Sequence, residues 1–111
     1  MTRLSTRHQI VAGSDPDIPD RLPDRFERGF RTEIWDLGGG YELKVHFNGT
    51  KEWYLNGKRH REDGPAMIQG NIIEYWLNDK QVIYKDYNSP EFEKRWQKLV
   101  DLERVRQVME D

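Results

Sequence analysis

The sequence has no cysteine, which excludes a disulfide framework and a zinc site built from thiolates. The strong metal ligands that remain besides the carboxylates are three histidines, and their spacing fits no metal-binding motif: His8, His46 and His60. We therefore expect neither a metal nor any other cofactor. A chain without cysteine also fits a reducing cytoplasm.

Long hydrophobic runs and an excess of one charge are missing too. The longest apolar runs are three or four residues, so we expect no membrane span, and Met1–Ser5 lacks the apolar stretch of a secretion signal. Lys and Arg together number 18 and Asp and Glu 20, and both signs are mixed along the whole chain. This balance disfavours a nonspecific nucleic-acid binder, which usually has a basic face, and a DNA mimic, which usually has an acidic excess.

Proline is concentrated near the start of the chain. With 111 residues the protein is long enough for one domain that folds without disulfides. Within residues 1–25, however, Pro16, Pro19 and Pro23 are mixed with aspartates and leave few apolar anchors. Such closely spaced prolines forbid a regular helix and disfavour a central strand. We expect a flexible or extended N-terminal arm, which is either a loose leader or lies across the folded body or a partner.

Residues 26–88 are predicted to form an antiparallel β meander of six or seven short strands. Apolar and polar residues alternate strictly over residues 41–47, which is the pattern of a strand with one buried face. The pairs Asn48-Gly49 and Asn56-Gly57 are strong signals for two-residue hairpins, because Asn and Gly tolerate positive φ. We expect the last strand to follow the turn at Asn78-Asp79 and to cover 81–84.

Part of this pattern is repeated. The segment Tyr54–Lys58 aligns with Trp76–Lys80, 22 residues further along the chain. A period of this length is typical of a repeated supersecondary unit, and the unit here is predicted to be a β-hairpin.

The segment Asn48–Ala66 resembles the tandem WYLNGKxHREDGPA repeats, which look related to MORN repeats and occur mostly in proteins of tailed bacteriophages. Gly70–Lys80 carries the aromatic-Leu-Asn-x-Lys half of the signature, and Ile34–Leu37 is a candidate degenerate copy, so that about half the chain is covered. The resemblance implies a phage origin, the host bacterial cytoplasm as location and a small antiparallel β scaffold. It transfers no catalytic residue, because the family has no single assigned activity.

Residues 89–111 are predicted to form an amphipathic helix, which makes the fold class α+β. Ser89 is a good N-cap, Pro90 suits the first helical position, and Glu91 and Glu93 place negative charge at the positive end of the helix dipole. An apolar stripe follows at three- and four-residue spacing: Phe92, Trp96, Leu99, Val100, Leu102 and Val105. We expect the stripe to pack on the sheet. The alternative is a homodimer through a narrower seam formed by Phe92, Leu99, Leu102 and Met109.

Titratable side chains are dense only in one turn, His60–Asp63. His60 and Glu62 are two residues apart in an extended segment and so share a face, while Asp63 is expected to bind backbone amides of its own turn. We interpret the cluster as structural, a His–Asp or Arg–Asp contact that braces one hairpin on the next. A partner contact and catalysis are the alternatives, and we expect that the protein is not an enzyme.

Binding residues are expected around the repeat. Aromatic residues make up 12% of the chain and charged residues 34%, and Trp, Tyr and Arg dominate interface hot spots. In Trp53-Tyr54 and in Tyr75-Trp76, adjacent side chains face opposite sides of the sheet, so one of each pair is exposed or covered by the helix or the arm. The predicted contact residues are Trp53, Tyr54, Lys58, Arg59, Arg61 and Tyr75.

The sequence thus favours a small non-enzymatic phage protein that binds and inhibits a host protein or defence system, in the style of anti-CRISPR proteins. One alternative is a nucleic-acid-binding accessory protein, in which Lys58, Arg59 and Arg61 neutralise phosphates beside the aromatic residues. Glu52, Glu62 and Asp63 lie close by and oppose this use unless the fold separates the two signs. A structural virion component is the third possibility.

Overall fold

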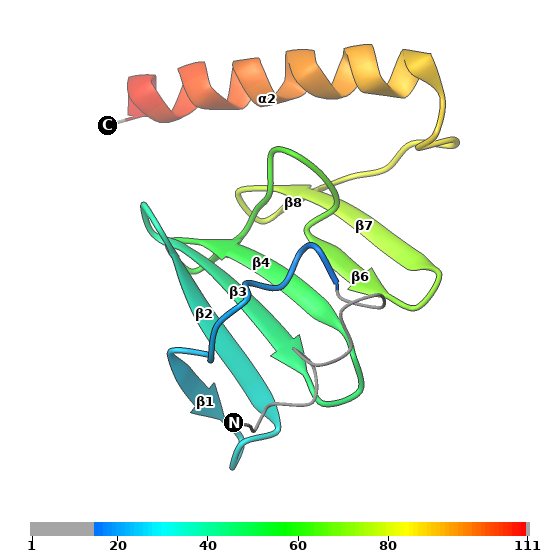
Figure 1. Ribbon diagram of the computed structural model, residues 1–111. Helices are drawn as coiled ribbons and strands as arrows, with labels where there is room; N and C mark the ends of the chain where they lie inside the picture. Colours follow the sequence, from blue (N-terminus) through cyan, green and yellow to red (C-terminus); the bar gives the residue numbers. More distant parts are fainter. Residues whose placement is uncertain (1–14, 111) are drawn as a thin grey trace.

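An antiparallel sheet of eight strands and one long helix make up residues 15–110, the part of the chain that this computed structural model describes (Figure 1). The elements are β1 (Arg25–Glu27), β2 (Thr32–Gly38), β3 (Tyr41–His46), β4 (Lys51–Leu55), β5 (Lys58–Arg59), β6 (Met67–Gln69), β7 (Ile72–Leu77), β8 (Lys80–Val82) and α2 (Pro90–Glu110). Neighbouring strands follow the order β1-β2-β3-β4-β6-β7-β8, and β5 pairs with β4. The predicted α+β fold, a β meander with a C-terminal helix, is confirmed. The start of the predicted arm, including His8, lies outside the described residues.

The sheet has more strands than the predicted six or seven because of two short elements, β1 and the two-residue β5. One turn also differs from its prediction. At Asn48-Gly49 only Gly49 has a positive φ, 92°. The Gly49 amide donates to the His46 carbonyl at 2.8 Å, and the Thr50 amide donates to Asn48 Oδ1 at 3.0 Å. The connection is therefore a three-residue loop with glycine in the left-handed position, where a two-residue hairpin was expected.

One face of the sheet carries the first hydrophobic core. In the strand register Trp35 lies opposite Leu43, and Leu43 lies opposite Trp53, so their side chains share this face. With Val45 they form a buried cluster, and Ile18 packs against it from the arm. Residues 15–24 cross this face in front of β2, β3 and β4 (Figure 1). This part of the arm lies on the body of its own chain.

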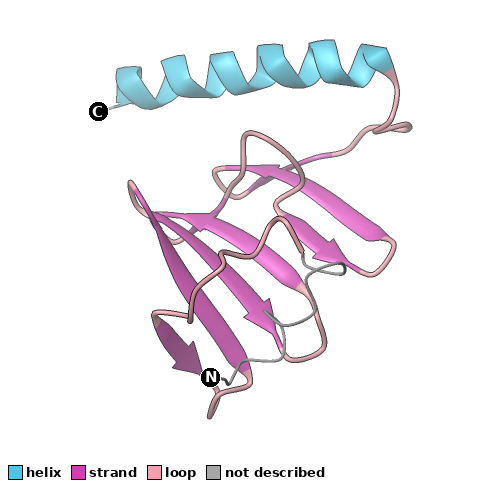
Figure 2. Ribbon diagram, in the orientation of Figure 1, coloured by secondary structure: helices cyan, strands magenta, loops and turns pink. Residues whose placement is uncertain are grey.

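The helix closes a second core at the other end of the same face. Figure 2 shows α2 crossing one end of the sheet, beyond β7 and β8. The buried residues of this core are Leu77, Phe92, Trp96 and Val100. Ser89 caps the helix, since its hydroxyl accepts a hydrogen bond from the Phe92 amide at 3.1 Å. The capping and the apolar stripe predicted the helix, but only Phe92, Trp96, Leu99 and Val100 of the stripe pack in this core, and Leu102 and Val105 are exposed.

The exposed side of α2 bears on the predicted dimer seam. Phe92 is only 4% exposed and belongs to the second core, so it is not free for a helix partner. Leu102 and Met109 are exposed and lie on the remaining helix surface. Among residues 15–110 no helix has the long apolar stretch that would be needed to cross a membrane.

Candidate functional site

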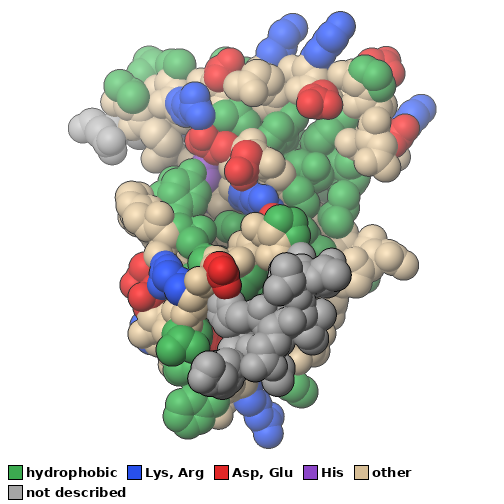
Figure 3. All heavy atoms as spheres, viewed as in Figure 1, with side chains coloured by type: hydrophobic (Ala, Val, Ile, Leu, Met, Phe, Trp, Pro, Cys, Tyr) green, Lys and Arg blue, Asp and Glu red, His purple; other side chains and the backbone are tan. Residues whose placement is uncertain are grey.

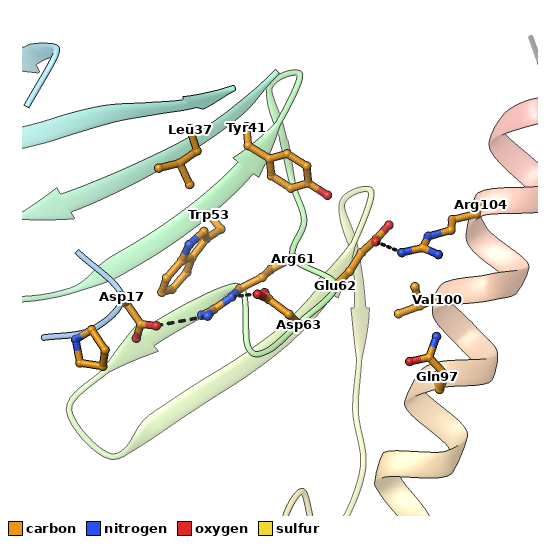
Figure 4. Close-up of a pocket in the computed structure, with 11 residues that line it drawn as sticks. Asp17, Leu37, Tyr41, Trp53, Arg61, Glu62, Asp63, Gln97, Val100 and Arg104 are labelled. Atoms are coloured by element: carbon orange, nitrogen blue, oxygen red, sulfur yellow. Dashed lines mark hydrogen bonds and ion pairs between the residues drawn. The ribbon is translucent and has the colours of Figure 1, made fainter. Parts of the chain in front are cut away.

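A cleft of about 720 Å³ lies between the two cores. Its walls come from the arm, the ends of β2 and β3, the loop between β5 and β6, and α2 (Figure 4). In the space-filling view a hollow lies beneath α2, with hydrophobic and charged side chains side by side (Figure 3). The lining residues are Pro16, Asp17, Leu37, Tyr41, Trp53, Arg61, Glu62, Asp63, Gln97, Val100 and Arg104.

Arg61 holds three of these walls together. Its guanidinium lies over the Trp53 ring with 3.9 Å between Cζ and the ring centroid, a cation–π contact. The same group donates to Asp63 Oδ1 at 2.8 Å, to Asp17 Oδ1 at 3.2 Å and to the Pro65 carbonyl at 3.1 Å. Arg61 therefore joins the loop, the first core and the arm through one side chain.

The helix side of the cleft is built on Glu62. The Trp96 indole N–H donates to the Glu62 carbonyl at 2.7 Å, and Arg104 donates to its carboxylate at 2.6 Å. The hydrogen bond from Arg104 is the main cause that holds the pKa of Glu62 below its ordinary value. At neutral pH the carboxylate is thus ionised and neutralised by its partner. These contacts fix the loop against α2.

His60 lies behind this loop and is 2% exposed. The Asn78 amide donates to its Nδ1 at 3.0 Å, so Nδ1 acts as an acceptor and the ring proton is on Nε2. Nε2 lies 3.4 Å from Glu62 Oε2. Both ring nitrogens therefore contact groups of the protein itself. Through the bond from Asn78, which lies in the turn of the second repeat, His60 connects the second repeat to the first.

Tyr41 supplies an uncharged polar group at the mouth of the cleft. Burial is the largest cause that raises the pKa of its phenol, followed by the nearby charges of Glu62 and Asp63. The phenol thus stays protonated well into the alkaline range and can donate a hydrogen bond. Together with Gln97 it offers neutral hydrogen-bonding groups beside the apolar side chains of the lining.

The charged groups of the cleft are mostly engaged with one another. Arg61 is paired with two aspartates and Arg104 with Glu62. Asp63, although it binds Arg61, is 85% exposed, and it contacts this side chain where backbone amides were expected as its partners. Arg61 thus binds aspartates of its own loop and of the arm, whereas the predicted contact between hairpins is made by His60, which accepts from the backbone amide of Asn78. In the described part of the chain no group of His, Asp and Glu is arranged to hold a metal ion.

The six predicted contact residues do not form one surface. Trp53 and Arg61 line the cleft, with Trp53 only 5% exposed. Tyr75 is half-buried beneath α2, where it packs edge-on against Phe92 and Trp96. The other three lie elsewhere: Lys58 is exposed in its turn, and Tyr54 and Arg59 are on the opposite face of the sheet.

On that opposite face Arg59 is a structural centre. Its side chain is 24% exposed, forms a hydrogen bond with Glu52 and lies 3.7 Å from Glu74. Burial alone would raise the pKa of Glu52, but a hydrogen bond to His46 and the charge of Arg59 outweigh it and lower that pKa. The fold therefore pairs the two signs of charge around the basic turn and does not separate them.

Sequence reasoning missed the residues that complete the cleft. Leu37, Tyr41, Gln97 and Arg104 come from a strand end, the next strand and the helix, and no local motif links them. These residues come together only in the folded protein, at the gap between the arm and α2. Comparison of the chain with protein families, with curated proteins and with solved structures yields no match.

Proposed function

We propose that this chain is a small non-enzymatic binding protein whose cleft receives a segment of a partner protein. The main support is that the charged groups of the cleft are paired with one another. Arg61 forms ion pairs with Asp17 and Asp63, and Arg104 forms one with Glu62. What remains for a ligand is the apolar side chain of Leu37, 41% exposed, the phenol of Tyr41 and the amide of Gln97, whose Nε2 also donates to Asp101 at 3.2 Å. Such a surface is suited to an apolar peptide segment with a few hydrogen bonds.

The same pairing disfavours nucleic-acid binding through the basic turn, Lys58 to Arg61. Binding a phosphate backbone requires cations that can exchange counterions for phosphates. Arg59 and Arg61, the two arginines of the basic turn, are engaged with carboxylates, which leaves Lys58 as the exposed cation of that turn. A single lysine supplies little affinity at physiological salt.

The biological setting of this proposal rests on the repeat signature in Asn48–Ala66. On that resemblance we propose a phage origin, action in the host bacterial cytoplasm and inhibition of a host protein or defence system. A virion component that uses the repeat as a spacer is the competing assignment. It predicts a ring or filament of many copies on size-exclusion chromatography, whereas the inhibitor is expected as a small species.

The cleft can be tested by blocking it with a bulky side chain. Gln97→Trp places an indole in the cleft, and Lys98→Trp places the same group on the next residue of α2, which lies outside the lining. Both positions are exposed, so neither change is expected to unfold the protein. Each variant and the wild type, carrying an affinity tag, are incubated with a nuclease-treated bacterial lysate, and retained proteins are identified by mass spectrometry.

We expect a stoichiometric partner on the wild type and on Lys98→Trp, and its loss on Gln97→Trp. Equal retention on all three proteins would show that the cleft is not the contact. Retention only when nuclease is omitted would favour the nucleic-acid alternative. Circular dichroism of both variants verifies that a lost contact does not reflect a lost fold.

A further inference from the structure

The end of the sheet farthest from α2 exposes large aromatic side chains. Two connections meet there, residues 28–31 between β1 and β2 and residues 47–50 between β3 and β4, at the bottom of Figure 1. Phe30 is 76% exposed and Phe47 is 81% exposed. We call residues 28–31 and 47–50 the turn end. Clustered exposed aromatics on a small protein commonly mark a contact surface.

The backbone of the first of these connections is strained. Arg28, Gly29 and Phe30 have φ values of 55°, 58° and 75°, three consecutive residues in the left-handed region. That region is unfavourable for a bulky side chain such as Phe, whereas Asn, Asp and Gly adopt it readily. The other positive-φ turns of the sheet use those residues, for example Asn56 and Gly57. The Phe30 ring packs edge-on against Phe26 with 5.0 Å between the centroids, but it stays largely exposed, so this one contact leaves most of the ring available to a partner.

Charge at the turn end is positive and unpaired. Within residues 15–110 the guanidinium groups of Arg28 and Arg31 form no ion pair and no hydrogen bond, and Arg31 Cζ lies 5.9 Å from the Phe47 ring centroid. A groove of about 430 Å³ runs between them, and Glu52, the carboxylate in its lining, is already bound to Arg59. Two free arginines beside aromatic rings are complementary to a carboxylate flanked by apolar groups.

A buried hydroxyl in the same groove lacks a partner. Thr50 is 8% exposed, and its Oγ1 has no hydrogen bond among the described residues. Buried polar groups in proteins are nearly always satisfied, so this hydroxyl is an exception beside the groove, although the atom itself is closed off from solvent. The amides of Asn48 and Gln69 line the groove as well. Side-chain amides both donate and accept hydrogen bonds, which a polypeptide backbone can match and lipid acyl chains cannot.

We propose that the turn end is a second contact surface, which binds an acidic and apolar segment of a partner protein. Carboxylates of that segment pair with Arg28 and Arg31, and an apolar side chain lies against Phe30 and Phe47. The proposal extends the binding function proposed above to a separate surface, and it does not depend on the cleft beneath α2.

Charge reversal at the turn end is the first test. The ¹⁵N-labelled full chain is titrated with a short peptide of alternating Glu and Leu, and with a matched peptide of alternating Lys and Leu. We expect amide shifts at residues 28–31 and 47–50 with the acidic peptide alone. Arg28→Glu with Arg31→Glu is expected to weaken binding at least about tenfold, whereas Lys58→Glu with Lys85→Glu, an equal change of net charge at exposed sites, leaves it unchanged. Equal loss in both double variants would overturn the site.

Phe30→Gly separates binding from folding. Glycine adopts a φ of 75° without strain, which offsets the lost edge contact with Phe26, so the melting temperature is expected to stay close to that of the wild type, while the acidic peptide binds several-fold more weakly. A lower melting temperature with unchanged peptide affinity would show that Phe30 serves the fold. Binding of phosphatidylserine vesicles without binding of the peptide would assign the surface to a membrane and overturn the proposal. Gln97→Trp must leave peptide affinity unchanged, which keeps this test independent of the cleft.

Discussion

The two copies of the repeated hairpin, residues 53–58 and 75–80, have the same backbone but are covered by different segments. We call these segments the two covers: the arm lies over the first copy and α2 over the second. Both turn with two successive residues at positive φ, Asn56-Gly57 at 51° and 84° and Asn78-Asp79 at 48° and 67°. The first aromatic of each copy faces the same side of the sheet. Trp53 lies there beneath the arm and Arg61, and Tyr75 lies beneath the helix.

The second aromatic of each copy faces the opposite side, and there the copies share one residue. Arg59 Cζ lies 5.7 Å from the Tyr54 ring centroid and 5.1 Å from that of Trp76. One guanidinium thus covers equivalent positions of both hairpins. The repeat therefore determines strand and turn, whereas burial of each aromatic depends on segments outside the repeat. The cleft lies where the two covers fail to meet.

Weakening the helix cover should have the largest effect on the free energy of unfolding. Trp96 is 7% exposed, packs on Tyr75 and donates to the Glu62 carbonyl. We expect Trp96→Ala to lower the free energy of unfolding by about 3–5 kcal/mol, the range for truncating a large buried aromatic. Urea denaturation followed by circular dichroism measures it.

The matched change in the other cover is Ile18→Ala, which truncates the arm residue that packs on the first core. Ile18 is only partly buried, so the expected loss is about 1 kcal/mol. Equal losses for Ile18→Ala and Trp96→Ala would mean that the arm contributes as much as the helix, and the difference between the covers would disappear.

Removing the shared arginine should affect both copies at once. Arg59→Ala leaves Glu52 and Glu74 without their common partner and uncovers two aromatic rings. Because its side chain is only 24% exposed, we expect a loss of about 2–3 kcal/mol, below the range for a fully buried pair. Lys58→Ala, one residue earlier and exposed, should stay within about 0.5 kcal/mol of the wild type. A thermal melt of the three proteins decides between a structural and a dispensable Arg59.

The sequence predicted those parts of the fold that depend on residues close together in the chain. The alternation over 41–46, the Asn56-Gly57 turn and the Ser89 cap each involve residues that are close in sequence, and each is found in the structure, although Phe47, the last residue of the predicted strand, lies exposed in the following loop. Propensity failed at Asn48-Gly49, where the Asn48 side chain binds the Thr50 amide and favours a longer loop.

The site was out of reach because its parts are distant in the sequence. Asp17 and Arg61 meet across 44 residues, and Glu62 and Arg104 across 42. Nothing in a single sequence shows that an aspartate among prolines is the partner of an arginine in a hairpin repeat. The adjacency rule did predict that Trp53 and Tyr54 face opposite sides, but it could not predict that Arg59 covers one of them.

The attachment of the arm should also respond to acid. The arm is attached through ion pairs of Lys51 with Asp15 at 2.6 Å and with Asp17 at 2.9 Å. Burial is the largest single influence on Asp15 and acts to raise its pKa, but the hydrogen bonds from Lys51 and the Asp17 amide and the charges of Lys51 and Arg61 together outweigh it, so the folded-state pKa lies below the ordinary 3.8. A lowered pKa stabilises the folded state above pH 3.8, and that contribution is lost as the pH falls through the folded-state pKa.

Lys51→Met removes this linkage and keeps an apolar stem of similar length. We expect wild type and variant to converge in stability below about pH 3, with the wild type more stable at neutral pH by about 1 kcal/mol or less, given solvent screening. Unfolding curves at several pH values measure the difference. A gap between the two proteins that is the same at all pH values would show that the arm is held by its apolar contacts alone.

The smallest expected effect concerns the one turn position at which the copies differ in chemistry, Gly57 against Asp79. Asp79 tolerates its φ of 67° less well than glycine would, but its Oδ1 accepts a hydrogen bond from the Arg59 amide at 2.7 Å. Asp79→Gly relieves the strain and loses the bond, so we expect a change within about 0.5 kcal/mol, while Asp79→Asn keeps both features. If Asp79→Gly alone raises the free energy of unfolding by about 1 kcal/mol, the hydrogen bond from the Arg59 amide does not stabilise the protein, and the two turns are interchangeable. A loss of that size would make Asp79 the contact that sets the second hairpin on the first.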